Sequence, residues 1–206
     1  MPRMKLTMTI KLHQIKNITT KITVILGVLA VGSIFMQTAH ATHYYSGNRW
    51  LGSSIDLCYD SNSLGLMNIG ATAAMSELDV ARTNWNNQPS VFTLNKISPG
   101  GFCHNWNTSA AYGKNGVLAT TFTSLTGSTI TDTDTEYNRS YSWTTSSNCS
   151  PEPYTMHFTA LHEFGHWVKF NHAPSSENSV MVPAYNCVKD SAVQSHDSSS
   201  LTTIYG

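Results

Sequence analysis

Three histidines and one glutamate near the C-terminal end of the chain have the types and spacing that bind a catalytic metal ion. His162 and His166 flank Glu163 in the pattern His-Glu-x-x-His. Histidines four positions apart lie one turn apart on the same face of an α-helix, so both imidazoles can bind one zinc ion. Glu163 lies one step around the helix, beside the metal rather than on it, and is a candidate general base for a zinc-bound water.

A third protein ligand is needed if the fourth position of a tetrahedral zinc is to stay open for water. His172 lies six residues beyond His166, and six residues of continuous helix would point it away from the metal. We therefore predict a turn between Val168 and Asn171 that brings His172 back. Asn171 tolerates left-handed backbone angles, and Pro174 discourages any continuation of the helix.

The whole pattern, His162-Glu163-x-x-His166-x-x-Lys169-x-x-His172, resembles the long zinc-binding motif of metzincin metallopeptidases. That family has glycine where this chain has Lys169, because the turn after the helix takes a left-handed conformation. A lysine in that conformation costs about 1 to 2 kcal/mol, which is small beside the free energy of metal binding.

A second segment, Ser-Val-Met-Val-Pro-Ala-Tyr at 179–185, resembles the methionine turn of the matrixin branch. The resemblance implies that Met181 lies beneath the zinc histidines and that Pro183 and Tyr185 form a wall after it. Residues 116–120 and 130–138 also look like the strand that borders the matrixin cleft and the segment before it. The likeness covers nearly all of residues 42–206.

This resemblance implies an α+β, zincin-like fold with a mixed, mostly parallel twisted sheet, an edge strand on the cleft, an active-site helix, a methionine turn and a C-terminal helix. It also implies a secreted endopeptidase with one catalytic zinc ion, in which Glu163 activates a zinc-bound water to hydrolyse extended polypeptides. The alternative is a catalytically weak or inactive zinc-binding surface or adhesion module. Glu163 favours the peptidase, because a purely structural site needs no acid beside an open coordination position.

The elements that must position these side chains are visible in the hydrophobic pattern. Residues 55–59 alternate as a half-buried strand does, and turn-forming residues follow at 60–63. A helix is predicted over 71–86, and strands are predicted at 91–97 and 117–122. The stretch from 101 to 116 reads as irregular. The helix 71–86 has an apolar stripe that should face the core: Ala74, Leu78, Ala81 and Trp85.

Two helices are expected in the second half of the chain. Residues 155–168 contain no proline and can form the helix that carries the histidines. Asp197 can cap a short C-terminal helix, with Leu201, Ile204 and Tyr205 facing inward and Gly206 ending it.

Three acidic side chains alternate with threonines in the extended run from Ile130 to Tyr137. On a strand, Asp132, Asp134 and Glu136 lie on one face. One interpretation is a calcium site or a polar strand bordering a cleft, and the other is a solvated edge strand kept soluble by charge. We favour the edge strand, because calcium sites usually gather their ligands from a curved loop.

Residues 1–41 have the three parts of a secretory signal peptide. Ile22 to Met36 is almost wholly apolar, and Ala39-His40-Ala41 supplies a cleavage site, so the mature chain should begin at Thr42. An uncleaved membrane anchor is the alternative, but the apolar run of about 15 residues is shorter than the roughly 20 that span a bilayer. Only basic charges precede the apolar run: Arg3, Lys5, Lys11, Lys16 and Lys21.

Residues 42–206 should form one catalytic domain. This part of the chain contains all 12 acidic residues but only some of the 12 basic residues, so it carries a net negative charge. We therefore expect no nucleic-acid partner. The expected partner is a polypeptide substrate, and we expect a secreted monomer with no stable membrane insertion. Four cysteines behind a signal peptide favour two disulfides. Of the three possible pairings, which the sequence does not decide, we favour Cys58 with Cys103 and Cys149 with Cys187.

Overall fold

The computed structural model describes residues 47–97, 101–148, 151–185 and 191–206. The predicted signal peptide and the predicted pair Cys149–Cys187 lie outside these residues. Among the described residues, no helix is long and apolar enough to cross a membrane.

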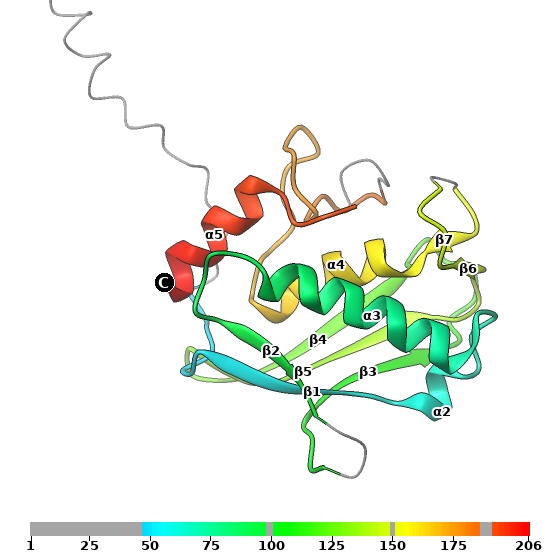
Figure 1. The fold of residues 1–206 in the computed structure, drawn as a ribbon, viewed down its shortest axis with the longest axis horizontal. Coiled ribbons are helices and arrows are strands. Elements are labelled where there is room, and N and C mark those ends of the chain that lie inside the picture. The colour runs from blue at the N-terminus through cyan, green and yellow to red at the C-terminus, as the bar shows by residue number, and fades with distance from the viewer. Residues whose placement is uncertain (1–46, 98–100, 149–150, 186–190) are drawn as a thin grey trace, which may run out of the picture. The chain divides into compact units, whose positions relative to one another are not determined.

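One five-stranded sheet forms the base of the fold, in the order β2-β1-β3-β5-β4 (Figure 1). β1, β2, β3 and β5 pair in parallel, and β4 runs antiparallel to β5 at the edge. The prediction of a mixed, mostly parallel sheet with an edge strand is therefore confirmed. The strands are β1 (Ser54–Tyr59), β2 (Thr93–Lys96), β3 (Asn105–Ala110), β4 (Ala119–Thr126) and β5 (Thr129–Asn138).

Two helices, α3 (Gly70–Asn86) and α4 (Met156–Trp167), lie on the same face of this sheet (Figure 1). The predicted stripe of α3 is confirmed, since its buried residues are Ala74, Leu78, Ala81 and Trp85. The indole of Trp85 donates a hydrogen bond to the carbonyl of Leu161 on α4, at 2.9 Å. Most of α4 is buried, because α3 covers it on one side and the sheet on the other.

Three short elements were not predicted as such. A four-residue helix, α2 (Ser61–Leu64), overlaps the turn expected at 60–63, and its N-cap Asp60 accepts a hydrogen bond from the backbone of Asn62. A second sheet consists of β6 (Trp143–Thr144) and β7 (Tyr154–Thr155), which pair in parallel just before α4 begins.

The prediction of an irregular stretch between residues 101 and 116 is wrong at β3. The side chains that β3 buries are polar, namely Asn105, Asn107 and Ser109, so the usual apolar alternation is absent. Hydrogen bonds compensate for the burial of Asn105 and Ser109. Asn105, for example, donates to the carbonyl of Asp56 and accepts from the backbone of Thr133.

The favoured prediction for residues 130–137 is also wrong, because β5 is an inner strand between β3 and β4. Its inward side chains include the buried threonines Thr133 and Thr135. The carboxylates alternate with them and are only partly covered, which an inner strand tolerates when one face of its sheet meets solvent. Asp134 accepts a hydrogen bond from the backbone of Trp106, at 2.7 Å. The edge strand next to β5 is β4.

The predicted C-terminal helix is α5 (Ser195–Tyr205), which ends at Gly206. Its N-cap is Gln194, not Asp197 as expected. Asp197 is instead the third helical residue and closes a capping box by accepting from the Gln194 backbone. Leu201 is buried, and Tyr205 packs against Phe92 with ring centroids 4.3 Å apart.

The predicted disulfide between Cys58 and Cys103 is confirmed. It joins β1 to the segment before β3, with Cα atoms 6.2 Å apart.

Candidate metal centre

The end of α4 determines where the third histidine lies. Lys169 has a φ of 69°, in the left-handed region that the turn requires. The backbone of Phe170 donates to the carbonyl of Gly165, and that of Lys169 donates to the carbonyl of His166, each at 2.9 Å. These two bonds form a Schellman motif, which normally has glycine at the position that Lys169 occupies. The chain therefore reverses where the sequence predicts a turn.

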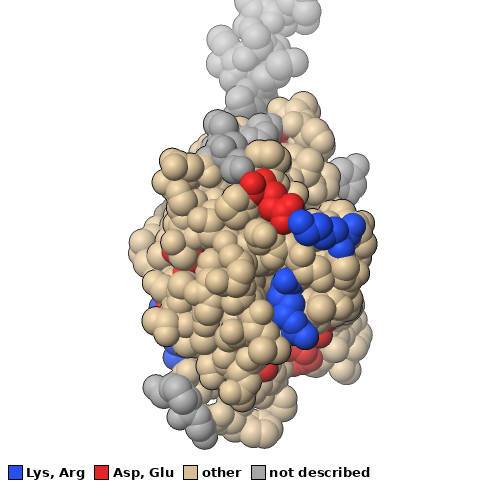
Figure 2. Space-filling view, turned by 90° about the vertical axis from the view of Figure 1, so that its right-hand side faces the viewer, with Lys and Arg blue, Asp and Glu red and all other residues tan. Residues whose placement is uncertain are grey.

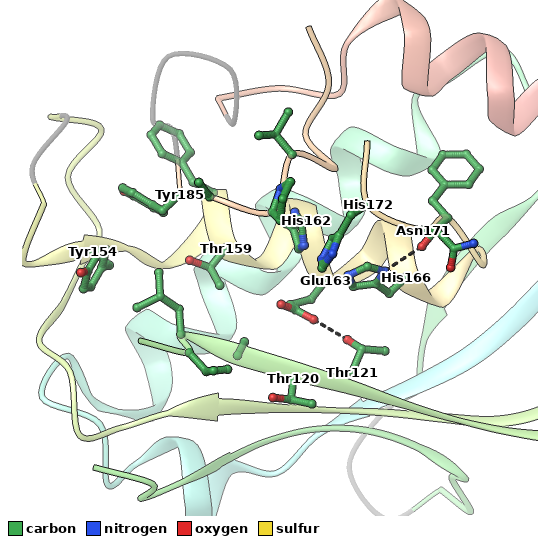
Figure 3. A pocket seen from close by; sticks show the side chains of 18 of the residues that line it. Thr120, Thr121, Tyr154, Thr159, His162, Glu163, His166, Asn171, His172 and Tyr185 are labelled. Atoms are coloured by element: carbon green, nitrogen blue, oxygen red, sulfur yellow. Dashed lines mark hydrogen bonds between the residues drawn. The ribbon is translucent and has the colours of Figure 1, made fainter. Parts of the chain in front are cut away.

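The turn brings His172 beside the two helix histidines (Figure 3). One ligand nitrogen from each of His162, His166 and His172 lies within 4.8 Å of the others. Within the described parts of the chain, these are the only three metal-ligating side chains that form such a group. Three imidazole nitrogens beside an open cleft suit zinc, which takes three protein ligands and keeps a fourth position free in catalytic sites.

Backbone carbonyls orient the two helix histidines. The Nδ1 of His162 lies 2.7 Å from the carbonyl oxygen of Val180, and the Nδ1 of His166 lies 2.7 Å from that of Phe170. A carbonyl only accepts, so each Nδ1 carries the hydrogen and each Nε2 keeps its lone pair for a metal ion. Burial lowers the pKa of both histidines to about 4, so both are neutral ligands at neutral pH.

Glu163 is buried, with 5% of its surface exposed, and it lies between the histidines and β4 (Figure 3). Burial raises the pKa of its carboxyl group above the ordinary value, which makes the carboxylate a stronger base. The nearby His166 and a hydrogen bond from Thr121 oppose this rise. The Thr121 hydroxyl donates to one carboxylate oxygen at 2.6 Å.

Met181 is fully buried and packs against α4. A Cβ atom on Gly165, which lies between the two helix histidines in sequence, would overlap the Met181 sulfur. The close contact therefore needs glycine at 165. The next residue back, Val180, supplies the carbonyl that orients His162.

The buried carboxylate of Asp197 holds the segment around Met181 in place. It accepts from the Ser179 hydroxyl at 2.6 Å and from the Val180 backbone at 3.0 Å. The Ser179 hydroxyl in turn accepts from the Met181 backbone, at 2.9 Å. The C-terminal helix is thus connected to the metal centre through Asp197, a link that the sequence did not indicate.

A cleft of about 720 Å³ runs along the histidines. Its walls are residues 116–121 and Thr123 on one side and residues 182–185, which include Pro183 and Tyr185, on the other. The Tyr185 hydroxyl accepts a hydrogen bond from the backbone of Thr155 at 2.9 Å, and its ring packs edge-on against Tyr154. These contacts give Tyr185 the position of a wall residue.

Sequence analysis did not identify Thr121 or its neighbour Thr135 as part of the centre. Thr121 and Glu163 are 42 residues apart, and no local spacing relates them. The only available signal was the alternation of threonines in the two predicted strands, which places one set of hydroxyls on the inner face of the sheet.

The matrixin family (peptidase M10) matches residues 102–206 of the chain. The match includes β3, β4, β5, α4, α5 and every residue of the metal centre. No curated protein matches the chain.

Proposed function

The chain belongs to the matrixin family of zinc-dependent metallopeptidases, and from this premise we propose that it is an endopeptidase that cleaves extended polypeptides with Glu163 as general base. One observation carries the proposal. Three histidine nitrogens converge beside a buried carboxylate on the floor of an open cleft.

The cleft suits a substrate in extended conformation. β4 is the last strand of the sheet and pairs with β5 on one side, and its first residues line the cleft. An extended peptide can add beside such an edge, where main-chain hydrogen bonds give affinity and side-chain pockets give selectivity. The expected partner is therefore an unfolded or flexible polypeptide segment.

Three histidines would hold the zinc ion: His162, His166 and His172. Zinc, when bound, supplies Lewis-acid chemistry that activates a water and polarises the substrate carbonyl. Glu163 takes a proton from the attacking water as the oxygen bonds to the carbonyl carbon. The same carboxyl group then delivers that proton to the amine nitrogen as the carbon–nitrogen bond breaks. Water is thus divided between the two products, and no serine or cysteine nucleophile takes part.

We also propose that the chain is exported and that cleavage after Ala41 releases it from the membrane. The composition of residues 1–41 and the disulfide Cys58–Cys103 support export, since disulfides persist in oxidising compartments. The mass of the exported protein tests this. A chain that begins at Thr42 is expected, and a full-length chain retained in membranes would contradict the proposal.

Hydrolysis of an unfolded general protein substrate tests the peptidase proposal, with Glu163→Ala as the matched variant. The wild-type protein should cleave the substrate, and the variant should lose at least about 100-fold in rate while it keeps one zinc ion per chain. Equal cleavage by both proteins would show a contaminating peptidase or a different base. Full zinc content without cleavage by the wild type would instead favour a zinc-binding module.

A further inference from the structure

A chain of hydrogen bonds leads from the core of the protein to the Glu163 carboxylate. The Trp167 indole donates to the Thr135 hydroxyl, at 2.7 Å. The Thr135 and Thr121 hydroxyl oxygens are 2.7 Å apart, and the Thr121 hydroxyl lies 2.6 Å from the carboxylate. Trp167 and Thr135 are fully buried.

The two ends of this chain determine the direction of every hydrogen bond in it. An indole N–H only donates, and an ionised carboxylate only accepts. Each threonine hydroxyl has one hydrogen, so Thr135 must donate to Thr121 and Thr121 must donate to Glu163. All members are then satisfied, and aligned donors of this kind strengthen one another.

Strand pairing holds the two threonines in register. Thr121 on β4 lies directly opposite Thr135 on β5 in the antiparallel ladder. Directly opposed side chains on one face have Cβ atoms about 4.5 to 5.5 Å apart, close enough for their hydroxyls to bond. The sheet therefore fixes the Thr121 hydroxyl at the position from which it reaches Glu163.

We propose that Thr121 is a positioning residue, whose hydroxyl holds the Glu163 carboxylate in the orientation that accepts a proton from the attacking water. This inference rests on the proposed role of Glu163 as general base. A glutamate side chain has several rotatable bonds, and the hydrogen bond to one oxygen removes most of that freedom. The second carboxylate oxygen is left for proton transfer.

Steady-state kinetics on the zinc-loaded protein test the positioning role. Thr121→Val keeps the shape of the side chain but removes the donor, so kcat should fall about 10- to 100-fold while KM changes less than about twofold. Thr121→Ser keeps the hydroxyl and should recover most of kcat.

Thr133→Val is the matched control for the loss of a threonine hydroxyl from the inner face of the sheet. Within the part of the chain that the structure describes, the Thr133 hydroxyl bonds only to the neighbouring Asp132 carbonyl. This variant should leave kcat within about twofold of the wild type. An unchanged kcat in Thr121→Val, or an equal loss in Thr121→Ser, overturns the proposal.

Nuclear magnetic resonance of the same zinc-loaded protein tests the hydrogen-bond chain without turnover. The indole signal of Trp167, assigned with Trp167→Phe, should shift in both Glu163→Ala and Thr121→Val. Glu163 and Trp167 are also one helical turn apart, so the decisive comparison is the double variant. Once Thr121 is valine, Glu163→Ala should no longer move the signal by the same amount. Additive shifts would contradict the chain.

The two measurements separate this inference from the function on which it rests. In one outcome, the wild-type protein cleaves nothing while its Trp167 signal still depends on Glu163 through Thr121. That result contradicts the peptidase proposal but leaves the hydrogen-bond chain intact. A protein that cleaves its substrate but shows additive shifts and an active Thr121→Val contradicts the positioning role alone.

Discussion

Burial acts in opposite directions on the two kinds of titratable side chain in the metal centre. It lowers the pKa of His162 and His166 to about 4 and raises the pKa of Glu163, because in each case it disfavours the charged form. The histidines are thereby kept as neutral ligands, and the carboxylate becomes more basic. One physical cause prepares both parts of the centre for their proposed roles.

The shifted histidines make the stability of the metal-free protein depend on pH. In the unfolded chain each takes up its proton near the ordinary value of 6.5, whereas in the folded protein it does so only near 4. Their contribution to the free energy of unfolding is therefore present above pH 6.5 and is lost as the pH falls toward 4. Between pH 7 and 5 the loss should be roughly 2 kcal/mol per histidine. The contribution of Glu163 to the free energy of unfolding depends on pH in the opposite direction, because its pKa is raised in the folded protein. This contribution is lost as the pH rises above 4.5.

Urea unfolding of metal-free protein at pH 7, 6 and 5 checks this prediction, with His166→Asn as the comparison. The variant lacks one of the shifted groups, so its stability should fall less over the same interval. An identical pH dependence in both proteins would argue against a depressed His166 pKa.

The left-handed backbone conformation of Lys169 lowers the stability of the protein. Its φ of 69° is strained for any side chain with a Cβ atom, so Lys169→Gly should stabilise the protein by about 1 kcal/mol. The turn already brings His172 to the other histidines, so kcat should change less than about twofold. Lys169→Ala keeps the strain and serves as the control in thermal unfolding. Destabilisation by glycine would mean that the lysine side chain itself supports the turn.

At the scale of elements, the centre depends on α4, β4, the segment around Met181 and α5. The sequence predicts that His162 and His166 share one face of α4, because residues four positions apart on a helix lie one turn apart. The apolar stripe of α3 was predictable for the same reason. The strand β3 was not predictable, because the side chains that it buries are asparagine and serine. The inner position of β5 was not predictable either, because strand order depends on long-range pairing that local sequence does not encode.

The contact between α4 and Met181 gives a test at this scale. Gly165→Ala should destabilise the protein by about 1 to 2 kcal/mol, because overlap with the Met181 sulfur outweighs the better helix propensity of alanine. Met181→Ala alone should cost about 2 to 4 kcal/mol. Once Met181 is alanine, Gly165→Ala should become neutral or stabilising. Additive effects in denaturant unfolding would show that the two residues do not touch.

The whole molecule carries few charges, at 12% of its residues, which is about half of the usual share. On the face drawn in Figure 2, uncharged side chains predominate between a few Lys, Arg, Asp and Glu side chains. A protein of this kind exerts little long-range electrostatic attraction on a substrate. Selection of substrate should therefore depend on contacts inside the cleft.

The salt dependence of kcat/KM measures this property. For a neutral peptide substrate, kcat/KM should change less than about twofold between roughly 0.05 and 0.5 M salt, because there is little surface attraction to screen. A steep fall with salt would reveal a charged docking region outside the cleft.

The most direct test of the central claim is a zinc titration of metal-free protein in which bound zinc and peptide-bond hydrolysis are measured together. The three-histidine centre predicts that activity rises in proportion to bound zinc and stops rising at one zinc ion per chain. His172→Ala should weaken zinc binding and lower the activity. Hydrolysis that is complete before zinc is added, or one tightly bound zinc ion without any hydrolysis, would contradict the account.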